Sequence, residues 1–244
     1  MTIYEKSDAI GGVWRYTPDP NDPHATPVYE NLRINVPAEC MGYMDFPFKT
    51  KSGDSFCGHA EVLLYLKEYA EKFNLMNKVK LSSEVENVEM IDDQWLVTVN
   101  QKTCQFDYVI VAIGRYTTIE NVDFPPCFEN NKFEGTIIPA CRYRRPQDWT
   151  GKNVVVLGSA QSGSDISIEL ADHAKSVTLI GSAPTPCITK KINRLESEWI
   201  QAITESGIIT TAERFVEADV IIVAAGYKYS FPFLKNILDF DSTG

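Results

Sequence analysis

The sequence predicts an α/β protein built from two doubly wound, Rossmann-like domains, of which the first is incomplete. Residues 153–180 support this class because they form a strand, a turn of small residues, a helix and a second strand, which is the βαβ unit of a parallel sheet. Residues 108–114 and 219–226 support it as well. Each is an apolar run rich in β-branched residues that ends in glycine, as is typical of strands buried on both faces.

The composition is that of a globular protein and argues against several other classes. The 244 residues are 44% hydrophobic and 23% charged, which is enough for one large domain or two modest ones. Lysine and arginine number 23 against 33 acidic residues, and the resulting net charge of −10 argues against nucleic-acid binding. No apolar run approaches the roughly 20 residues that span a bilayer, and residues 1–12 lack the apolar centre of a signal peptide. We therefore expect a cytoplasmic protein, and association of a longer form with the endoplasmic reticulum membrane is compatible with the sequence.

The six cysteines are spread along the chain, and no two of them form a C-x-x-C pair. This spacing predicts neither a zinc site nor a redox-active dithiol, so no metal is expected and a disulfide reductase is disfavoured. Scattered, reduced thiols are typical of an intracellular protein of this length.

The first half of the chain is predicted to alternate irregular segments with short regular elements. Residues 2–5 look like the end of a strand, and they lead into a turn at Gly11-Gly12. Apolar residues at helical spacing between Val62 and Phe73 predict an amphipathic helix. Alternating apolar residues predict three further strands, which could form one antiparallel layer, at 79–83, 85–90 and 95–100.

The strongest pattern is the turn between the strand that begins at Asn153 and the helix predicted at 164–174. Gly158, Ala160 and Gly163 occupy the three positions of a dinucleotide-binding turn, with alanine in the middle position. The first residue makes the sharp turn, the second lets the backbone approach a pyrophosphate, and the third lets helix and strand pack closely. An ordinary strand-to-helix turn without a ligand is the alternative, and the surrounding βαβ unit favours the ligand.

The strand predicted at 176–180 bears on the identity of the nucleotide. It ends at Gly181 and Ser182, and it lacks the acidic residue that holds the ribose 2′-hydroxyl of NAD at this position. Three cations follow, and positive charge favours the 2′-phosphate of NADP. These cations are Lys190, Lys191 and Arg194, and the alternative is that they form a solvated loop face.

Glu5 is compatible with a second nucleotide site near the N-terminus, and the alternative is an ordinary exposed glutamate before a glycine turn. It closes a strand as the acid of an adenine-dinucleotide unit does, and two glycines and Trp14 follow it. The first strand of such a unit and its glycine turn are expected before Glu5, where the sequence has only four residues. Because that strand lies at the centre of the sheet, we expect the first domain to be split and its inner edges to promote aggregation.

Together these segments resemble the flavin-containing monooxygenases, a family of class B flavoproteins that oxygenate nitrogen and sulfur. Residues 4–16 resemble the family's second-strand segment, and residues 31–48 resemble its Asn-Leu-x-x-Asn to Asp-Phe-Pro stretch. Residues 158–166 resemble its second glycine motif. The resemblance extends to the fingerprint residues Phe133, Gly135 and Tyr143, to the hinge strands at 112–114 and 224–227, and to residues 229–234.

The resemblance implies two FAD/NAD(P)-binding domains. The implied organisation is a partial FAD-binding domain at 1–147, an NADP-binding domain at 148–222 and a return segment at 223–244. It further implies that NADPH reduces FAD and that the reduced flavin uses O₂ to oxygenate a small-molecule amine or thioether. The protein's part in such chemistry is to position the cofactors and to exclude water. A homo-oligomer is compatible with this organisation.

The resemblance also assigns residues to the two cofactors. Asn35 matches the family's active-site asparagine, whose amide can donate and accept hydrogen bonds near the flavin and the nicotinamide, so it is the expected catalytic residue. The residues expected around FAD are Glu5, Gly12, Val13, Trp14, Asn35 and Val36. Those expected around NADP(H) are Gly158, Ala160, Ser162, Gly163, Ser164 and Asp165.

The sequence also departs from the family pattern. Pro139 stands where the fingerprint has histidine, and both hinge threonines are replaced, by Ile113 and Ala225. The glycine turn expected before Glu5 is a further difference. The alternative function is therefore a non-catalytic or degenerate fragment that retains only an NADP(H)-binding unit.

Overall fold

The computed structural model describes residues 1–114, 124–129, 131–182, 189–227, 230–235 and 237. The chain divides into two compact units, which are described separately. Unit 1 comprises residues 1–17, 23–118 and 229–244, and unit 2 comprises residues 18–22 and 119–228. The domain boundaries at 147 and 222 stay a prediction.

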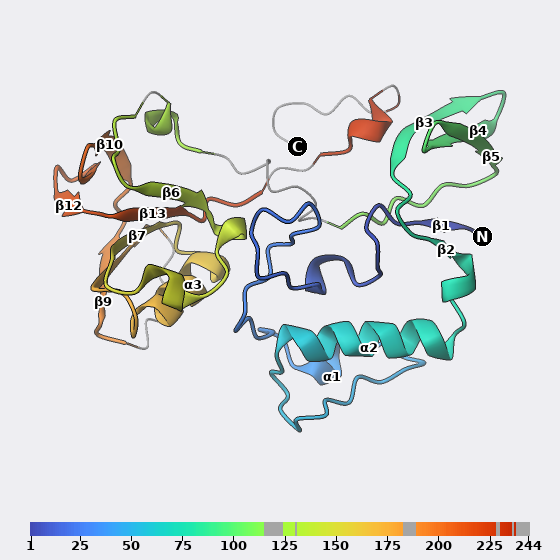
Figure 1. Ribbon diagram of the computed structural model, residues 1–244, viewed down its shortest axis with the longest axis horizontal. Helices are drawn as coiled ribbons and strands as arrows, with labels where there is room; N and C mark the ends of the chain where they lie inside the picture. The colour runs from blue at the N-terminus through green and yellow to red at the C-terminus, as the bar shows by residue number, and fades with distance from the viewer. Residues whose placement is uncertain (115–123, 130, 183–188, 228–229, 236, 238–244) are drawn as a thin grey trace. The chain divides into compact units, whose positions relative to one another are not determined.

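Unit 2 contains the predicted parallel sheet, which confirms the α/β class. Its five strands run in the order β6-β13-β7-β8-β9, and every neighbouring pair is parallel (Figure 1). The helix α3 (Gln161–Leu170) connects β7 to β8. This order places a topological switch point between β7 and β13, where open sheets of this class bind ligands. The strands are β6 (Thr136–Pro139), β7 (Asn153–Leu157), β8 (Ser176–Gly181), β9 (Ile192–Glu196) and β13 (Val220–Val223).

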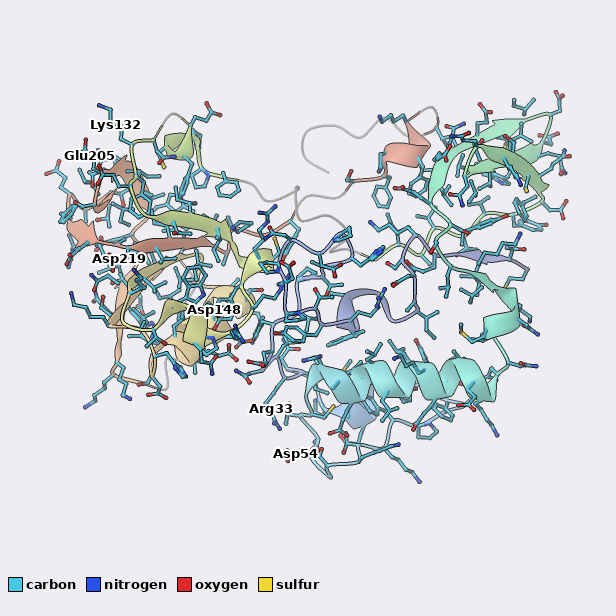
Figure 2. All side chains as sticks on the ribbon, in the orientation of Figure 1. Arg33, Asp54, Lys132, Asp148, Glu205 and Asp219 are labelled. Atoms are coloured by element: carbon cyan, nitrogen blue, oxygen red, sulfur yellow. The ribbon has the colours of Figure 1, made fainter. Side chains whose placement is uncertain are left out.

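The central strand β7 and its neighbour β13 are buried along their whole length. Their continuous β-branched sequence fits this position, because the inner strands of a parallel sheet are covered on both faces. At the amino end of the pair, the backbone N–H of Asn153 donates to Asp219 Oδ2 at 2.7 Å (Figure 2 labels Asp219). Strands predicted at 153–158, 176–180 and 219–226 are thus confirmed, with shorter or slightly shifted ends.

A three-stranded antiparallel meander completes the core of unit 2. It consists of β10 (Ile200–Thr204), β11 (Gly207–Thr210) and β12 (Phe215–Glu217). Ile200 and Ile208 from this meander pack with Val155, Leu157 and Ile180 on one face of the parallel sheet. Short 3₁₀ turns lie at η3 (Pro126–Phe128), η4 (Ala140–Arg142) and η5 (Pro146–Trp149).

Unit 1 is organised around the helix α2 (His59–Lys72), which confirms the amphipathic helix predicted from Val62 to Phe73. An aromatic cluster covers its buried side. The Tyr65 hydroxyl donates to Phe46 O at 2.7 Å and accepts from Tyr43 N at 2.8 Å, and the Tyr65 ring stacks on Phe48 with centroids 4.4 Å apart. The smaller helical elements of this unit are η1 (Gly12–Trp14), α1 (Ala38–Met41), η2 (Met76–Lys78) and η6 (Pro232–Leu234).

The strands of unit 1 differ partly from those predicted. The antiparallel layer is formed by β3 (Val85–Ile91), β4 (Gln94–Val99) and β5 (Lys102–Phe106), the last of which the sequence pattern did not predict. The strand predicted at 79–83 is shorter. As β2 (Val79–Lys80), it pairs in parallel with β1 (Ile3–Tyr4) instead of joining the layer.

The buried strand predicted at 108–114 is wrong for this structure. The segment has no regular structure, and the side chains of Tyr108 and Ile110 are 87% and 88% exposed. Only the partly buried Val109 packs against the β3-β4-β5 layer. The physical reason is the missing neighbour: a parallel strand is buried on both faces only when a sheet continues beside it, and β1 and β2 form a two-stranded sheet.

Candidate functional site

The glycine turn of unit 2 has the geometry that its spacing predicts. Gly158 has a φ of +102°, and a Cβ at this position would lie 2.3 Å from Ala224 O. A Cβ on Gly163 would lie 1.8 Å from Gly158 O. Any larger residue at either position would therefore displace backbone. The first glycine makes the turn and the third allows close packing of α3 against β7, as dinucleotide-binding turns require.

The amino end of α3 is open to solvent at this turn. Ala160, the middle residue of the motif, and Ser162 are both exposed. The first turn of α3 contains no acidic residue, so its unpaired N–H groups and the positive end of the helix dipole remain available to an anion. This is the local arrangement that binds a pyrophosphate in βαβ units.

The two remaining residues predicted for NADP(H) have internal partners. The hydroxyl of the buried Ser164 donates to Ser159 O at 3.0 Å. The carboxylate of Asp165 accepts from Gln161 Nε2 at 3.1 and 3.2 Å. The turn thus exposes Ala160 and Ser162 and partly exposes Gly158, whereas the buried Gly163 and Ser164 support it from within.

Two of the three predicted cations lie at the amino edge of the parallel sheet, and the third lies in the middle of β9. Lys190 and Lys191 precede β9 and therefore lie at the amino ends of the strands, where Lys191 forms an ion pair with Asp172. A nucleotide in this fold lies at the carboxyl ends. Their predicted role with a 2′-phosphate therefore disagrees with the structure. Arg194 lies further along β9 and is the cation of the three that approaches the carboxyl edge.

The fingerprint residues lie before, at the end of and after β6, and one of them, Tyr143, contacts α3. Phe133 packs into the core of unit 2, and a Cβ on Gly135 would lie 2.4 Å from Asp219 O. Pro139 is the last residue of β6. Tyr143 is fully buried and its hydroxyl donates to Glu169 Oε2 at 2.9 Å. The sequence pattern does not predict Glu169 as a site residue. Its place on α3 between Ile166 and Leu170, two apolar residues that are buried, is the sequence feature that could have indicated a partner for a buried side chain.

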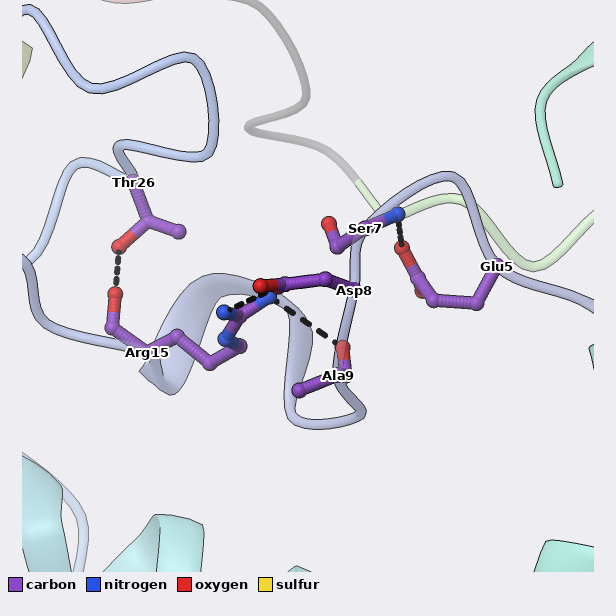
Figure 3. A network of polar contacts seen from close by, with 6 residues as sticks. All are labelled: Glu5, Ser7, Asp8, Ala9, Arg15 and Thr26. Atoms are coloured by element: carbon purple, nitrogen blue, oxygen red, sulfur yellow. Dashed lines mark hydrogen bonds and ion pairs between the residues drawn. The ribbon is translucent and has the colours of Figure 1, made fainter. Parts of the chain in front are cut away.

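In unit 1, Glu5 shapes the segment in which FAD-binding residues were predicted. Its backbone N–H donates to Lys80 O at 3.0 Å, which extends the β1-β2 pairing, and its Oε1 accepts from Ser7 N at 2.8 Å (Figure 3). The carboxylate therefore lies immediately after the strand, where an acid that holds a ribose belongs.

Arg15 stabilises the loop that follows Glu5. Its Nη2 forms an ion pair with Asp8 at 2.7 Å and its Nη1 donates to Ala9 O at 3.3 Å, while its own carbonyl accepts from Thr26 Oγ1 at 2.6 Å (Figure 3). The enclosed turn contains Gly12, with a φ of +51° and no atom within 4 Å of a hypothetical Cβ. The backbone at Gly12 is thus open to the close approach of a ligand, next to Val13 and Trp14 of η1.

Asn35 and Val36 lie on a short exposed segment that is anchored at both ends. Ile34 N donates to Cys57 O at 3.0 Å, and Ala38 N donates to Ser55 O at 2.8 Å. The intervening side chains are exposed, Val36 to 44%. Both residues belong to unit 1, as do Glu5 and Gly12, whereas the predicted NADP(H) residues belong to unit 2.

None of the described cysteines forms a disulfide. Burial raises the pKa of Cys57, Cys127 and Cys141, which keeps these three thiols protonated. Cys187 lies outside the described residues. Within the described part of the chain, no group of three or more His, Cys, Asp or Glu side chains could hold a metal ion. A search of the same residues finds no helix with the length and hydrophobicity to cross a membrane.

Comparisons with known proteins agree with this geometry. The profile of a family described as flavin-binding monooxygenase-like matches residues 1–194. Among curated relatives from Arabidopsis thaliana, flavin-containing monooxygenase FMO GS-OX5 is 33% identical over 263 residues and FMO GS-OX2 is 35% identical over 266 residues. Each alignment covers 97% of this chain but 57% of the relative, so the chain spans about half the length of the curated relatives it matches.

Solved structures give the same result. S-allyl-L-cysteine S-oxygenase from Allium sativum superposes with a TM-score of 0.81 at 30% identity, covering 95% of this chain and 58% of that protein. Tmm from Pelagibacter sp. strain HTCC7211 superposes with a TM-score of 0.82 at 26% identity, covering 95% of this chain and 56% of that protein.

Proposed function

The chain belongs to the flavin-binding monooxygenase-like family, and from that premise we propose that it carries the cofactor-binding part of an NADPH- and FAD-dependent monooxygenase. The substrates would be small molecules with a soft nucleophilic nitrogen or sulfur atom, and O₂ would be the oxidant. The name of the Allium sativum S-oxygenase, at 30% identity, supports sulfur as one such atom.

The observation that carries this proposal is the turn between β7 and α3. Its two packed glycines and its exposed, acid-free helix terminus fit the pyrophosphate of NADP(H). We assign Gly158, Ala160 and Ser162 to direct contact through their backbone, with Gly163 packing α3 against the turn and with Ser164 and Asp165 supporting it. Unit 2 is therefore the NADP(H)-binding unit of the proposed enzyme.

The features of unit 1 fit part of an FAD site. Glu5 would hold the ribose, and the open backbone at Gly12 with Val13 and Trp14 would lie beside the flavin. Asn35 is the proposed catalytic residue, because its exposed amide can donate to or accept from a group at the flavin, and the anchored backbone beside Val36 holds it in place. When bound, FAD supplies the oxidation and reduction chemistry, whereas these residues bind, orient and exclude water.

The alternative is a protein that binds NADP(H) through unit 2 and has no flavin chemistry. Two sequence features and one structural feature motivate it: Pro139 in place of histidine, the replaced hinge threonines, and the pairing of just β1 and β2 as parallel strands among the described residues of unit 1. The family membership favours the enzyme.

One spectroscopic experiment separates the two functions. The purified chain is incubated with FAD, free flavin is removed, and the visible absorbance is recorded before and after NADPH is added under argon. Retained flavin that NADPH bleaches supports the monooxygenase. A chain that retains no flavin but binds NADP⁺ in a fluorescence titration supports the alternative, and a chain that binds neither contradicts both.

A further inference from the structure

The carboxyl end of β8 is where the ribose next to the adenine is expected in a bound dinucleotide. In this chain the position is Gly181, and a Cβ there would lie 2.5 Å from Ser159 Oγ and 2.6 Å from Ser159 N. The glycine turn thus packs directly on the end of β8 and leaves no room for an acidic side chain. A side chain of a neighbouring element can therefore distinguish a 2′-hydroxyl from a 2′-phosphate.

The neighbouring element is the end of β9. Glu196 is the register partner of Gly181, and Arg194 is the register partner of Leu179. The pairing continues past the strand, since Ser197 N donates to Gly181 O at 3.2 Å. The end of β9 therefore lies one strand spacing, about 4.8 Å, from the end of β8.

Arg194 and Glu196 lie on the face of the sheet that α3 covers. Side chains alternate along a strand, and Leu195 packs into the core on the opposite face. Arg194 Nη2 forms an ion pair with Glu196 Oε1 at 2.8 Å, which holds the guanidinium toward the carboxyl edge. The Arg194 side chain is 22% exposed and that of Glu196 is 57% exposed. The ion pair is therefore partly shielded from solvent but remains accessible to a ligand.

We propose that Arg194 is the residue that recognises the 2′-phosphate of NADP(H) and that Glu196 is its counter-ion, which sets how strongly unit 2 prefers NADP(H) to NAD(H). This inference rests on the proposed NADP(H)-binding function of unit 2. The planar guanidinium can bind a phosphate with two parallel hydrogen bonds. Glu196 orients Arg194 before the nucleotide binds and competes with the phosphate for the same donors.

The competition gives the two residues opposite effects. Removing Arg194 takes away the attraction for the 2′-phosphate and leaves a carboxylate that repels it. Removing the charge of Glu196 frees Arg194 and removes that repulsion. NAD⁺ has the same pyrophosphate and adenine but no 2′-phosphate, so its affinity should not depend on Arg194.

The test is a set of fluorescence titrations of the purified 244-residue chain with NADP⁺ and with NAD⁺. The variants are Arg194→Gln, Glu196→Gln and, as the matched control at the opposite edge of the sheet, Lys191→Gln. Arg194→Gln should weaken NADP⁺ binding by about tenfold or more, as expected for loss of a charge-assisted hydrogen bond. Glu196→Gln should strengthen NADP⁺ binding by about two- to fivefold, the range of an exposed ion pair. Neither variant should change NAD⁺ binding, and Lys191→Gln should change neither affinity.

The outcomes separate this inference from the proposed function. A wild-type chain that binds neither nucleotide overturns both. If the wild-type chain binds NADP⁺ and Arg194→Gln binds it equally well, the inference alone is overturned. The same holds if Arg194→Gln loses affinity for NADP⁺ and NAD⁺ equally. Thermal melts of each variant show whether it is folded, and the gain expected for Glu196→Gln cannot arise from unfolding.

Discussion

The hydroxyl of Tyr143 and the carboxylate of Glu169 form a hydrogen bond of 2.9 Å that joins the segment after β6 to the helix α3. Tyr143 is fully buried and Glu169 is half-buried, so this bond is partly shielded from solvent. It ties the segment after β6 to α3, the helix that begins at the glycine turn. A fingerprint residue and the nucleotide-binding turn are thus parts of one packed assembly.

We expect Tyr143→Phe to destabilise unit 2. The variant keeps the ring but removes the donor to Glu169, and a buried hydrogen bond to a charged group contributes about 1.5–3 kcal/mol. Urea unfolding followed by circular dichroism measures this loss. Tyr108→Phe is the control, because the Tyr108 side chain is 87% exposed and its hydroxyl should contribute almost nothing. Equal midpoints for the two variants would contradict the structural role of the bond.

A second prediction concerns the third glycine of the turn. Gly163→Ala should destabilise the chain by about 1–3 kcal/mol, because the new methyl group would have to push apart α3 and the turn after β7. Gly58→Ala is the control: its φ of −75° suits alanine, and the nearest atom to its Cβ would be Leu32 O at 3.9 Å. Thermal melts of the two variants should differ clearly. A Gly163→Ala protein as stable as wild type would show that α3 and β7 pack less closely than the structure indicates.

A third prediction concerns the exposed run at 108–114. Ile110→Lys should reduce self-association and leave the free energy of unfolding within about 0.5 kcal/mol, because an 88% exposed side chain makes few native contacts. Static light scattering and urea unfolding measure the two quantities. Val109→Lys is the matched control, since Val109 packs against the β3-β4-β5 layer and its replacement should destabilise unit 1. If Ile110→Lys unfolds the chain as readily as Val109→Lys does, this segment is packed and the description is wrong.

A fourth prediction concerns pH. Burial lowers the pKa of His59, whose Nε2 contacts Glu30 O at 3.2 Å and whose ring packs on Tyr16. The folded chain therefore holds this imidazole neutral, whereas the unfolded chain takes up a proton below about pH 6.5. The contribution of His59 is complete above that pH and is lost as the pH falls toward the lowered pKa of the folded state.

The measurement is the melting temperature at intervals from about pH 7.5 to about pH 5.5. His59→Gln keeps a side-chain N–H for Glu30 O but cannot titrate, so its melting temperature should fall less over this range than that of wild type. Parallel curves for the two proteins would assign the pH dependence to other groups.

Much of unit 2 could be predicted from the sequence because its elements depend on local patterns. The β-branched runs at Asn153 and Val220 are long and continuous enough to identify buried strands. The sequence pattern predicts the start of α3 three residues too late, because Gln161 and Ser162 are exposed and do not contribute to the apolar periodicity of the helix. The strand β5 was missed for a similar reason: four of its five side chains are exposed.

The errors in unit 1 and at the site arise from pairing, which a local pattern does not contain. Residues 108–114 have the composition of a buried strand, but a strand also requires a neighbour to pair with. The place of Lys191 at the far edge of the sheet, and of Glu196 beside Gly181, follows from parallel register between β8 and β9. Glycine spacing alone identified Gly158 and Gly163, because their role is determined by backbone geometry within one turn.

The position of β13 has a consequence for how the chain is made. It lies between β6 and β7 in the sheet, although it follows all the other described strands of unit 2 in the sequence. A growing polypeptide on the ribosome therefore has every other strand of unit 2 available before the one that joins β6 to the rest of the sheet. Until residue 223 emerges, β6 and β7 lack the strand that pairs with both of them, and such unpaired strand edges are prone to misassembly.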